Sequence, residues 1–385
     1  MSNSALKIAL FTYSTKPRGS VIHTLELAQA LHLSGHQVCI YALDKDGSGF
    51  DYPLSCSYQP IAALEAPFEI ELLIQQRINE FIEFLSQDDL DYDIYHAQDC
   101  LSANALAHLK GQRKIPYFIR TVHHIEEFPS IYLQECQLRS ILQADLCFAV
   151  SNQWKLVLQK DYQINAVQVF NGVNTNRFTQ VTNGTEDLLK NRLGIKGYPV
   201  YLTVGGIEPR KNSLTLLKAF SLLLKEYPQA QLIIAGGATL FDYHDYRDEF
   251  FVLVNQLNLT VGESLLLPGV VSESELSALY RIADVFVFPS LKEGWGLVIL
   301  EAIASGLAVI TLNQPPFTEF LTQKEAFLVD VNSPEAIAKA MIDILETQIH
   351  RNLVKNSKSV ISKYSWQASA KIHLEQYYKM LLAHA

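Results

Sequence analysis

Short apolar, strand-like runs alternate with segments of helical periodicity along the whole chain, and this pattern limits the fold most. Strands and helices in regular alternation are typical of parallel α/β sheets. In the first half we expect strands at Ile8–Thr12, Val38–Tyr41, Ile94–Ala97, Tyr117–Thr121, Leu146–Val150 and Val167–Phe170, and helices near Ile22–Ser34, Glu69–Leu85, Ala103–Lys110, Tyr132–Gln143 and Asn152–Asp161.

The alternation occurs twice, which indicates two domains. The chain becomes polar over Thr179–Glu186, and the alternation restarts at Val200–Val204. A length of 385 residues also exceeds what one ordinary core needs. We therefore predict two Rossmann-like domains, residues 1–178 and 186–362. Strands of the second are expected at Tyr201–Val204, Leu232–Ala235, Leu265–Leu267, Val285–Phe288, Val309–Thr311 and Phe327–Val329.

Composition describes a folded globular protein and argues against several kinds of partner. Hydrophobic residues make up 49% of the chain and charged residues 18%. The net charge of -9, without clustered Lys and Arg, argues against a nucleic-acid partner. No apolar run approaches the length of an integral membrane segment, and no basic amphipathic helix suggests an anionic membrane surface.

The N-terminus and the cysteines favour a cytoplasmic location. Residues 1–14 carry one lysine and a short apolar run, so we expect a first strand there and not a signal peptide. The cysteines are odd in number and include no CxxC pair, which is typical of buried thiols in a reducing compartment. They are Cys39, Cys56, Cys100, Cys136 and Cys147.

The segment Ser290–Gly306, SLKEGWGLVILEAIASG, places two carboxylates, Glu293 and Glu301, eight positions apart around a glycine hinge. It follows the apolar run Val285–Phe288 and Pro289, so we expect a buried strand, a tight loop and a helix. Ligands of open α/β sheets bind at such loops, outside the carboxyl ends of strands.

The start of the predicted helix, near Leu297, favours an anion. Its first amides have no intrahelical acceptor, and Gly294 and Gly296 leave the backbone unshielded. Helical side chains lean toward the N-terminus, so Glu301 can approach the pocket that Glu293 reaches from the loop. We therefore expect two carboxylates to flank a phosphate site. The alternative is an amphipathic helix whose Glu301 faces solvent, although this glutamate lies in an apolar run.

This segment resembles the E-x7-E signature of retaining glycosyltransferases of family 4 (glycosyltransferase group 1), which have the GT-B fold. The resemblance implies an α/β protein whose two Rossmann-like domains face each other across a cleft. The N-terminal domain would bind the acceptor and the C-terminal domain the nucleotide-sugar donor, and residues 363–385 would form a helix that packs back on the first domain. In this family the first Glu lies beside the donor sugar, the second bonds the ribose and the amides between them hold the diphosphate, which here implies Glu293, Glu301, Gly294, Gly296 and Leu297.

The stretch Val204–Asn212 joins a predicted strand to a helix near Leu214 and carries Arg210 and Lys211. Two cations at a helix start are unfavourable for the helix dipole unless an anion occupies that end. The stretch resembles the donor-phosphate loop of the family, in which an Arg and a Lys neutralise the leaving diphosphate. Many members have Arg at the position of Gly206, and we expect Arg210 to replace it. A solvated turn with incidental charge is the alternative.

The connection Tyr13–Ser20 follows the first strand and resembles the family's glycine-rich loop, which brings backbone amides near the donor phosphate and the acceptor. The family commonly has two glycines where this chain has Gly19 and Ser20. The hydroxyl and amide of Ser20 can still donate hydrogen bonds. An ordinary strand-to-helix connection is the alternative.

Histidines stand at the ends of two strands. In the family a His at the end of Arg120–His124 lies close to the donor sugar and contributes to turnover. His123 matches that position better, and His124 is the second candidate; a structural role is the alternative. His96 and Asp99 close the preceding strand, and we assign them, with His124, to the acceptor side.

Asp89, Asp91 and Asp93 have the spacing of the metal-binding Asp-x-Asp of the other major glycosyltransferase fold. That motif should follow a hydrophobic strand, whereas these residues precede Ile94–Ala97. We therefore expect a solvated loop, no metal requirement and no cofactor. The arginine–lysine pair and the helix N-terminus can supply the positive field instead.

The sequence predicts a retaining, hexosyltransferase-type glycosyltransferase that moves a sugar from a nucleotide sugar to an acceptor hydroxyl. Alternatives are a nucleotide-sugar epimerase or phosphorylase of the same fold and a binding module without catalysis. An NAD-dependent oxidoreductase lacks a complete GxGxxG after the first strand, where Gly19 stands alone. The base, the sugar and the acceptor depend on loops such as Asp44–Pro60 and Asn313–Glu319, and no oligomeric state is predicted.

Overall fold

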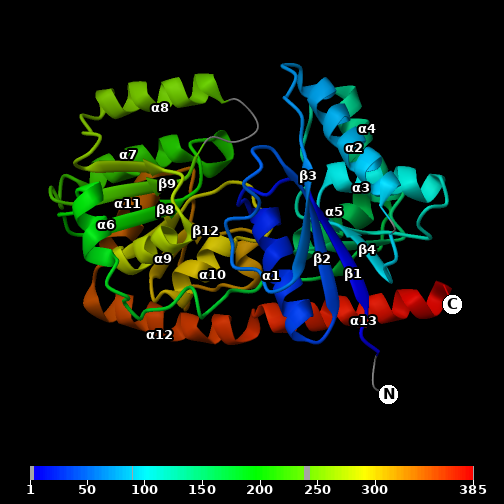
Figure 1. The fold of residues 1–385 in the computed structure, drawn as a ribbon. Coiled ribbons are helices and arrows are strands. Elements are labelled where there is room, and N and C mark those ends of the chain that lie inside the picture. Colours follow the sequence, from blue (N-terminus) through cyan, green and yellow to red (C-terminus); the bar gives the residue numbers. More distant parts are fainter. Residues whose placement is uncertain (1–3, 89, 238–242, 385) are drawn as a thin grey trace. The chain divides into compact units, whose positions relative to one another are not determined.

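The computed structural model describes residues 4–88, 90–237 and 243–384 and divides into two compact units (Figure 1). The first unit contains Met1–Gly172 and Ser365–Ala385, and the second contains Val173–Tyr364. Each unit has its own parallel sheet with helices on both faces, so the predicted pair of Rossmann-like α/β domains is confirmed. No helix in the described ranges is long and apolar enough to span a bilayer.

The sheet of the first unit has the strand order β3-β2-β1-β4-β5-β6-β7, and all its pairs are parallel. The direction of the connections reverses between β1 and β4, so their carboxyl ends border the crevice where such sheets bind ligands. The strands are β1 (Lys7–Thr12), β2 (Gln37–Asp44), β3 (Ser57–Ala62), β4 (Ile94–Ala97), β5 (Ile119–Val122), β6 (Leu146–Ala149) and β7 (Val167–Gln168).

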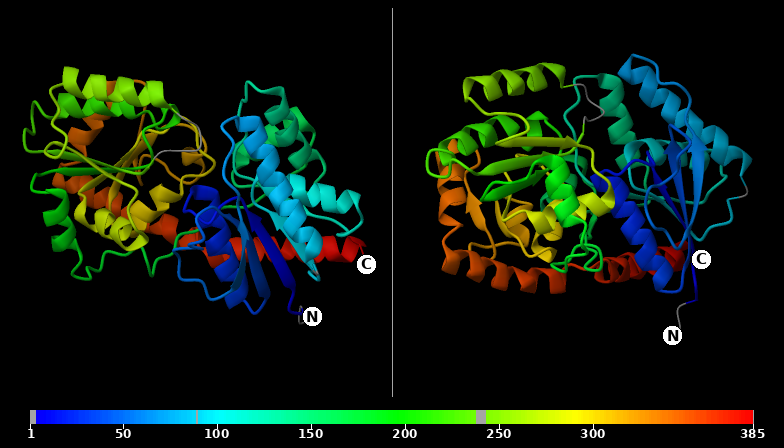
Figure 2. Two further views of the ribbon diagram at one scale, coloured as in Figure 1. Left: turned by 45° about the horizontal axis from the view of Figure 1, so that its top comes forward. Right: turned by 60° about the vertical axis from the view of Figure 1, so that its left-hand side comes forward.

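Helices of the first unit cover its sheet in two groups. Helix α3 packs between α2 and α4, and the C-terminal helix α13 lies beside α1 (Figure 2). Helix α13 therefore belongs to the first unit although the chain reaches it only after the second. The helices are α1 (Gly19–Leu33), α2 (Ile70–Gln87), α3 (Cys100–Gly111), α4 (Ile131–Leu142), α5 (Asn152–Tyr162) and α13 (Trp366–His384).

Strand β3 was not predicted, and the range Asp44–Pro60 that we took for a loop ends inside it. Of its residues only Ile61 is buried, and Pro60 interrupts the apolar pattern. The strand lies at the edge of the sheet and pairs with β2 alone. An edge strand needs no apolar run, which explains why the pattern missed it.

The sheet of the second unit has the order β10-β9-β8-β11-β12-β13, again with parallel pairs. All predicted strands of this half are present. Here the reversal falls between β8 and β11, the strands that precede the predicted phosphate loops. The strands are β8 (Val200–Val204), β9 (Gln231–Ala235), β10 (Leu265–Gly269), β11 (Val285–Phe288), β12 (Ala308–Leu312) and β13 (Phe327–Val329).

Helices lie on both faces of this second sheet. Helix α7 contacts α8 and α11, while α10 contacts α12 and α6 contacts α9 on the other face (Figure 1). Short 3-10 turns cover Pro209–Lys211 and Phe317–Glu319. The helices are α6 (Glu186–Leu193), α7 (Ser213–Leu223), α8 (His244–Gln256), α9 (Glu273–Ile282), α10 (Leu297–Ala304), α11 (Pro334–Asp343) and α12 (Thr347–Lys363).

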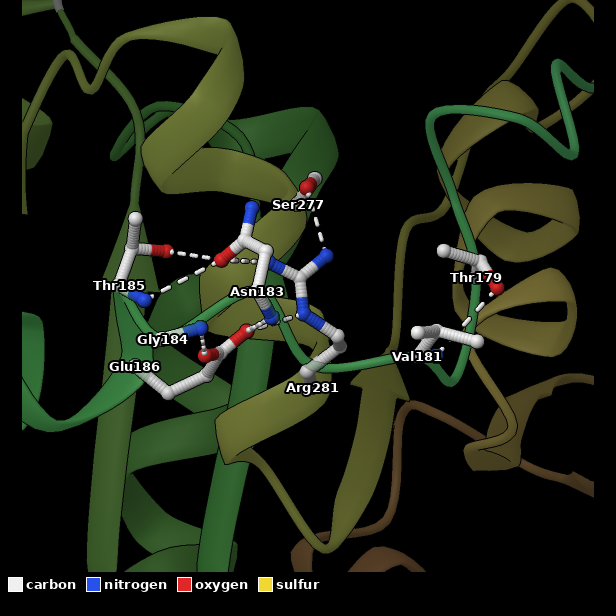
Figure 3. Close-up of polar contacts among 8 residues, drawn as sticks. All are labelled: Thr179, Val181, Asn183, Gly184, Thr185, Glu186, Ser277 and Arg281. Carbon is white, nitrogen blue, oxygen red and sulfur yellow. Dashed lines mark hydrogen bonds and ion pairs between the residues drawn. The ribbon is translucent and has the colours of Figure 1, made fainter.

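The polar stretch that we interpreted as a linker is anchored within the second unit (Figure 3). Arg281 of α9 donates to the carboxylate of Glu186 and, from Nη2, to Oδ1 of Asn183 at 3.3 Å. The same carboxylate accepts the amide of Gly184 at 3.0 Å. The polar residues of this stretch therefore provide hydrogen-bond acceptors for Arg281, whose side chain is 3% exposed, and do not form a loose linker.

Candidate active site

Two loops at the carboxyl ends of β8 and β11 are joined directly. The carbonyl of Arg210 accepts the amide of Leu291 at 2.8 Å and the hydroxyl of Ser290 at 3.0 Å. Asn212, in a left-handed conformation with φ of 58°, donates its side-chain amide to the carbonyl of Val331 at 2.8 Å. The two bonds to the Arg210 carbonyl hold the arginine–lysine loop against the glutamate loop where the sheet reverses direction, and the Asn212 bond ties the same loop to the segment after β13.

Glu293 contacts both cations that we predicted for this site. Its Oε1 lies 2.9 Å from Nη1 of Arg210, 2.5 Å from Nζ of Lys211 and 2.7 Å from the hydroxyl of Ser290. The structure thus brings Arg210, Lys211 and Glu293 together. The sequence assigned all three to the donor site but did not predict that they pair with one another. It adds Glu208, whose Oε1 lies 2.8 Å from Nη2 of Arg210. The position of Glu208, two residues before Arg210, was the available signal for this carboxylate.

The charges of this cluster are balanced and mostly buried. Side chains of Glu208, Glu293 and Lys211 are 4%, 14% and 13% exposed, and that of Arg210 is 38% exposed. Burial alone would raise the pKa of Glu293, but Lys211, Arg210 and the Ser290 hydroxyl lower it to about 2. Burial lowers the pKa of Lys211, against the opposing effect of Glu293. Two carboxylates therefore already neutralise the two cations that we expected to meet a diphosphate.

Helix α10 begins, as predicted, at Leu297. Gly296 precedes it with φ of +109°, and a Cβ there would lie 2.9 Å from the ring of Phe317. Glu301 is buried and its Oε2 accepts the hydroxyl of Tyr280 at 2.9 Å, so the alternative of a solvent-facing carboxylate is wrong. Gly294 lies in the preceding loop, between Glu293 and the helix.

Two glycines lie beside the cations, and close packing explains the first of them, Gly205. A Cβ on Gly205 would lie 2.9 Å from the side chain of Lys211, whose Nζ lies 4.6 Å from the centre of the Phe288 ring. Gly206, where many family members have arginine, is buried. The lysine side chain therefore crosses a surface that only a glycine backbone leaves open.

In the first unit, Gly19 is the first residue of α1, and a Cβ there would meet nothing within 4 Å. The carbonyl of Ser20 accepts the hydroxyl of Thr24 at 2.8 Å. Arg18 precedes the helix in an extended conformation, and its side chain makes no capping bond. The predicted strand-to-helix loop is present, but the fold itself does not require glycine at position 19.

His123 follows β5 and is half-buried. Its Nε2 lies 3.3 Å from Oε1 of Gln98, and its ring packs edge-on against His23 at 4.7 Å between centres. Burial lowers the pKa of His123 well below the usual value, so the ring is neutral at pH 7. His124 is exposed and pairs with Glu126 at 2.9 Å. The two histidines therefore have different surroundings, as expected for consecutive residues at a strand end.

The other acceptor-side candidates lie in the interior of the first unit. His96 is fully buried, with Nδ1 2.7 Å from the Tyr377 hydroxyl and Nε2 2.7 Å from that of Thr121. Asp99 caps α3 by accepting the amide of Ser102 at 2.9 Å, and burial raises its pKa. In this arrangement both ring nitrogens of His96 already have partners, so its acceptor role stays a prediction without a contact to support it.

The described aspartates before β4 bind the first residue of the neighbouring central strand β1. Asp91 pairs with the side chain of Lys7 at 2.5 Å, and Asp93 accepts the Lys7 amide at 2.8 Å. Asp89 lies outside the described residues. Among the residues described, no group of three or more His, Cys, Asp or Glu side chains is placed to hold a metal ion.

Sequence reasoning missed the side chains that surround these histidines. Gln98 is fully buried between His96 and His123, while His23 of α1 and His373 of α13 complete the cluster. Gln98 belongs to the strand-end motif His96–Asp99, so its position carried a signal. The other two lie in helices without any strand-end pattern.

Two family models match consecutive parts of the chain. The model described as Glycosyltransferase Family 4 matches residues 17–177, and the one described as Glycosyl transferases group 1 matches residues 185–360. The first covers the strand-to-helix loop and the histidines, and the second covers the ion-pair cluster. An uncharacterized glycosyltransferase of Methanocaldococcus jannaschii is 25% identical, over 95% of this chain and 96% of its own.

Other relatives and solved structures agree. Mannosylfructose-phosphate synthase of Agrobacterium fabrum is 24% identical over 84% of this chain and 78% of its own. The structure of sucrose-phosphate synthase from Thermosynechococcus elongatus superposes with a TM-score of 0.80 at 23% identity, covering 99% of this chain and 100% of its own. HepE from Anabaena, solved with UDP and glucose, has a TM-score of 0.76 at 17% identity, with 96% and 99% coverage. The chain is a GT-B glycosyltransferase and belongs to glycosyltransferase family 4.

Proposed function

We propose that the chain transfers a hexosyl group, with retention at the anomeric carbon, from a nucleoside-diphosphate sugar to an acceptor hydroxyl. The observation that carries this proposal is the contact of Glu293 with both Arg210 and Lys211 at the carboxyl ends of β8 and β11. The solved complex of HepE, which has the same fold, with UDP-glucose supports the donor class.

The diphosphate of the donor would compete with Glu293 for the cations. The bond from the anomeric carbon to the diphosphate oxygen breaks, and negative charge builds up on that oxygen. The acceptor oxygen bonds to the anomeric carbon on the face that the diphosphate leaves, and the acceptor proton passes to the released diphosphate. Lys211 and Arg210 can stabilise the charge on the diphosphate, because each needs only to exchange a carboxylate oxygen of Glu293 for an oxygen of the diphosphate. The amides at the start of α10 add donors that no side chain caps. No metal or cofactor is part of this proposal.

In the donor-free protein Lys211 and Arg210 lower the pKa of Glu293 to about 2, so Glu293 would act as a carboxylate and not as a proton donor while it keeps one of these cations as a partner. The oxygen that the diphosphate frees can accept a hydrogen bond from a sugar hydroxyl and hold the ring for transfer. Glu301, fixed by Tyr280, is proposed to accept the ribose hydroxyls. His123, neutral at pH 7, is proposed to contact the sugar.

A panel of nucleotide sugars tests the donor class first. A ligand that binds only the folded state raises the melting temperature. Donors that stabilise the protein are then offered with hydroxyl acceptors, and nucleoside diphosphate release is measured with and without EDTA. The configuration of the product by proton NMR tests retention. A donor that binds but is neither transferred nor hydrolysed with any acceptor would favour a binding module.

Glu293→Gln tests the site itself. The amide keeps the shape but cannot neutralise Lys211, so turnover should fall by roughly a hundredfold or more. Glu249→Gln, an exposed change on α8, is the matched control and should be neutral. Unchanged turnover in a folded Glu293→Gln protein would remove this residue from the site.

A further inference from the structure

We propose that Gln98 is a positioning residue that sets the tautomer of His123 and ties it to the C-terminal helix α13. This inference rests on the proposed function only where it concerns turnover. Its physical basis is a chain of hydrogen bonds inside the first unit, formed by Gln98, His96, His123, Tyr377 and Thr121.

The chain begins at the side-chain amide of Gln98, which is fully buried. Its Oε1 lies 3.3 Å from Nε2 of His123, and its Nε2 lies 3.2 Å from Nε2 of His96. An amide oxygen only accepts and an amide nitrogen only donates. In this orientation His123 must therefore carry its proton on Nε2, and His96 must offer a lone pair on the same atom.

The state of His96 is set in turn by α13. With Nε2 accepting, the proton of the neutral ring lies on Nδ1, which donates to the Tyr377 hydroxyl at 2.7 Å. The Thr121 hydroxyl, 2.7 Å from Nε2, is then a second donor to that nitrogen. Tyr377 and His96 are both fully buried, so water cannot replace either contact freely.

The tautomer of His123 fixes which ring nitrogen accepts a hydrogen bond. With Nε2 protonated toward Gln98, Nδ1 carries the lone pair and can accept a hydrogen bond from a ligand hydroxyl. If the amide turned over, the pattern would invert and Nδ1 would become a donor. Gln98 thus decides which hydrogen bond His123 can offer to a sugar. The titratable groups nearest His123 are His23, Arg120, His124 and His96.

The test is nitrogen-15 NMR of the histidine rings in the whole protein, which distinguishes the two tautomers without any substrate. Wild-type His123 should be protonated at Nε2. In Gln98→Leu this preference should be lost, and in Tyr377→Phe, where the change lies at the far end of the chain, it should weaken. Should Gln98→Leu fail to fold, Tyr377→Phe decides alone.

Gln112→Leu is the matched control, because Gln112 bonds a surface histidine, His108, at 2.8 Å in the same unit. It should leave His123 unchanged. In transfer assays Gln98→Leu should lower kcat by roughly tenfold, as for loss of one orienting hydrogen bond, with little change in the KM for donor. An unaltered His123 tautomer in folded Gln98→Leu overturns the proposal, and if that variant does not fold, an unaltered tautomer in Tyr377→Phe overturns it. If the tautomer shifts but no transfer is found for the wild type, only the proposed function fails.

Discussion

The two units share one sheet topology but differ in the chemistry at the point where the sheet reverses. In the second unit that point holds charges: Arg210 and Lys211 face Glu208 and Glu293. In the first unit the buried side chains near the corresponding point include amides and neutral histidines such as His96. The same backbone arrangement therefore supports an ionic cluster in one unit and, in the other, a hydrogen-bonding cluster of neutral rings and an amide that lies near the buried Arg120.

The difference is consistent with the proposed roles of the two units, donor diphosphate in the second and acceptor hydroxyl in the first. A diphosphate carries charge and needs cations that can exchange one carboxylate ligand for a phosphate oxygen. A sugar or alcohol carries hydroxyls, for which neutral rings and amides of defined orientation are better partners. Burial acts on both clusters: the histidines of the first unit are neutral, whereas the ions of the second unit stay charged because each has an oppositely charged partner within 3 Å.

Lys211→Ala should have the largest effect, because it removes the more buried cation and leaves Glu293 with one. We expect kcat/KM to fall by about 100- to 1,000-fold and calorimetric binding of the free nucleoside diphosphate to weaken strongly. His123→Asn should lower kcat while leaving nucleoside diphosphate binding unchanged. Lys225→Ala, an exposed change after α7, is the control. Equal losses of diphosphate affinity in the Lys211 and His123 variants would contradict the proposal that the ionic cluster of the second unit binds the diphosphate.

A fall in pH should also distinguish the two units, because it should destabilise the first more than the second. Burial lowers the pKa of His23 to about 4 and that of His373 to about 3, and the Nε2 of each has no hydrogen-bond partner among the described residues. Both rings are therefore neutral in the fold, but each takes up a proton near pH 6.5 when unfolded. Their contribution to stability is complete above pH 6.5 and is lost as pH falls toward 4, about 2 kcal/mol per histidine between pH 7 and pH 5.

The stability of the second unit should not change over the same fall from pH 7 to pH 5. The pKa of Glu293 is lowered from 4.5 to about 2, so its stabilisation is complete above pH 4.5 and is lost only below it. Hydrogen exchange at pH 7 and pH 5, followed by mass spectrometry, measures each unit separately. Loss of protection at pH 5 should be confined to the first unit, and His373→Leu should reduce it. Equal loss in both units would show that these histidines do not control acid stability.

Local pattern was enough to predict the ionic site but not the neutral one. Strand β11, its loop and α10 are consecutive in the chain, so Glu293, Gly296 and Leu297 could be placed from periodicity and glycines alone. Arg210 and Lys211 stood at the end of another predicted strand. Parallel strands end at one edge of a sheet, so the topology explains why these cations lie near Glu293, although the sequence did not predict the ion pairs.

The neutral site depends on contacts between distant parts of the chain. His23 bonds Asn171, 148 residues away, and His96 bonds Tyr377, 281 residues away. Helical histidines such as His23 have no period that distinguishes a buried network from a surface position. Edge strand β3 was not predicted for a different reason, because its residues are mostly exposed and form no apolar run. What sequence pattern cannot supply is the identity of the neighbour that a buried polar group meets.

The glycines of the two predicted loops give the smallest effect and the sharpest contrast. Gly296→Ala would place a methyl group at φ of +109° and 2.9 Å from Phe317, so we expect a loss of about 1–3 kcal/mol in urea unfolding and a misplaced start of α10. Gly19→Ala meets nothing within 4 Å and sits at a helical position, so stability should hold or rise by up to about 1 kcal/mol. Gly111→Ala, equally unhindered but at the far end of α3, is the control. If Gly19→Ala keeps its stability but loses transfer activity while Gly111→Ala keeps both, glycine at position 19 serves the approach of a substrate; if activity is also kept, that loop is an ordinary connection.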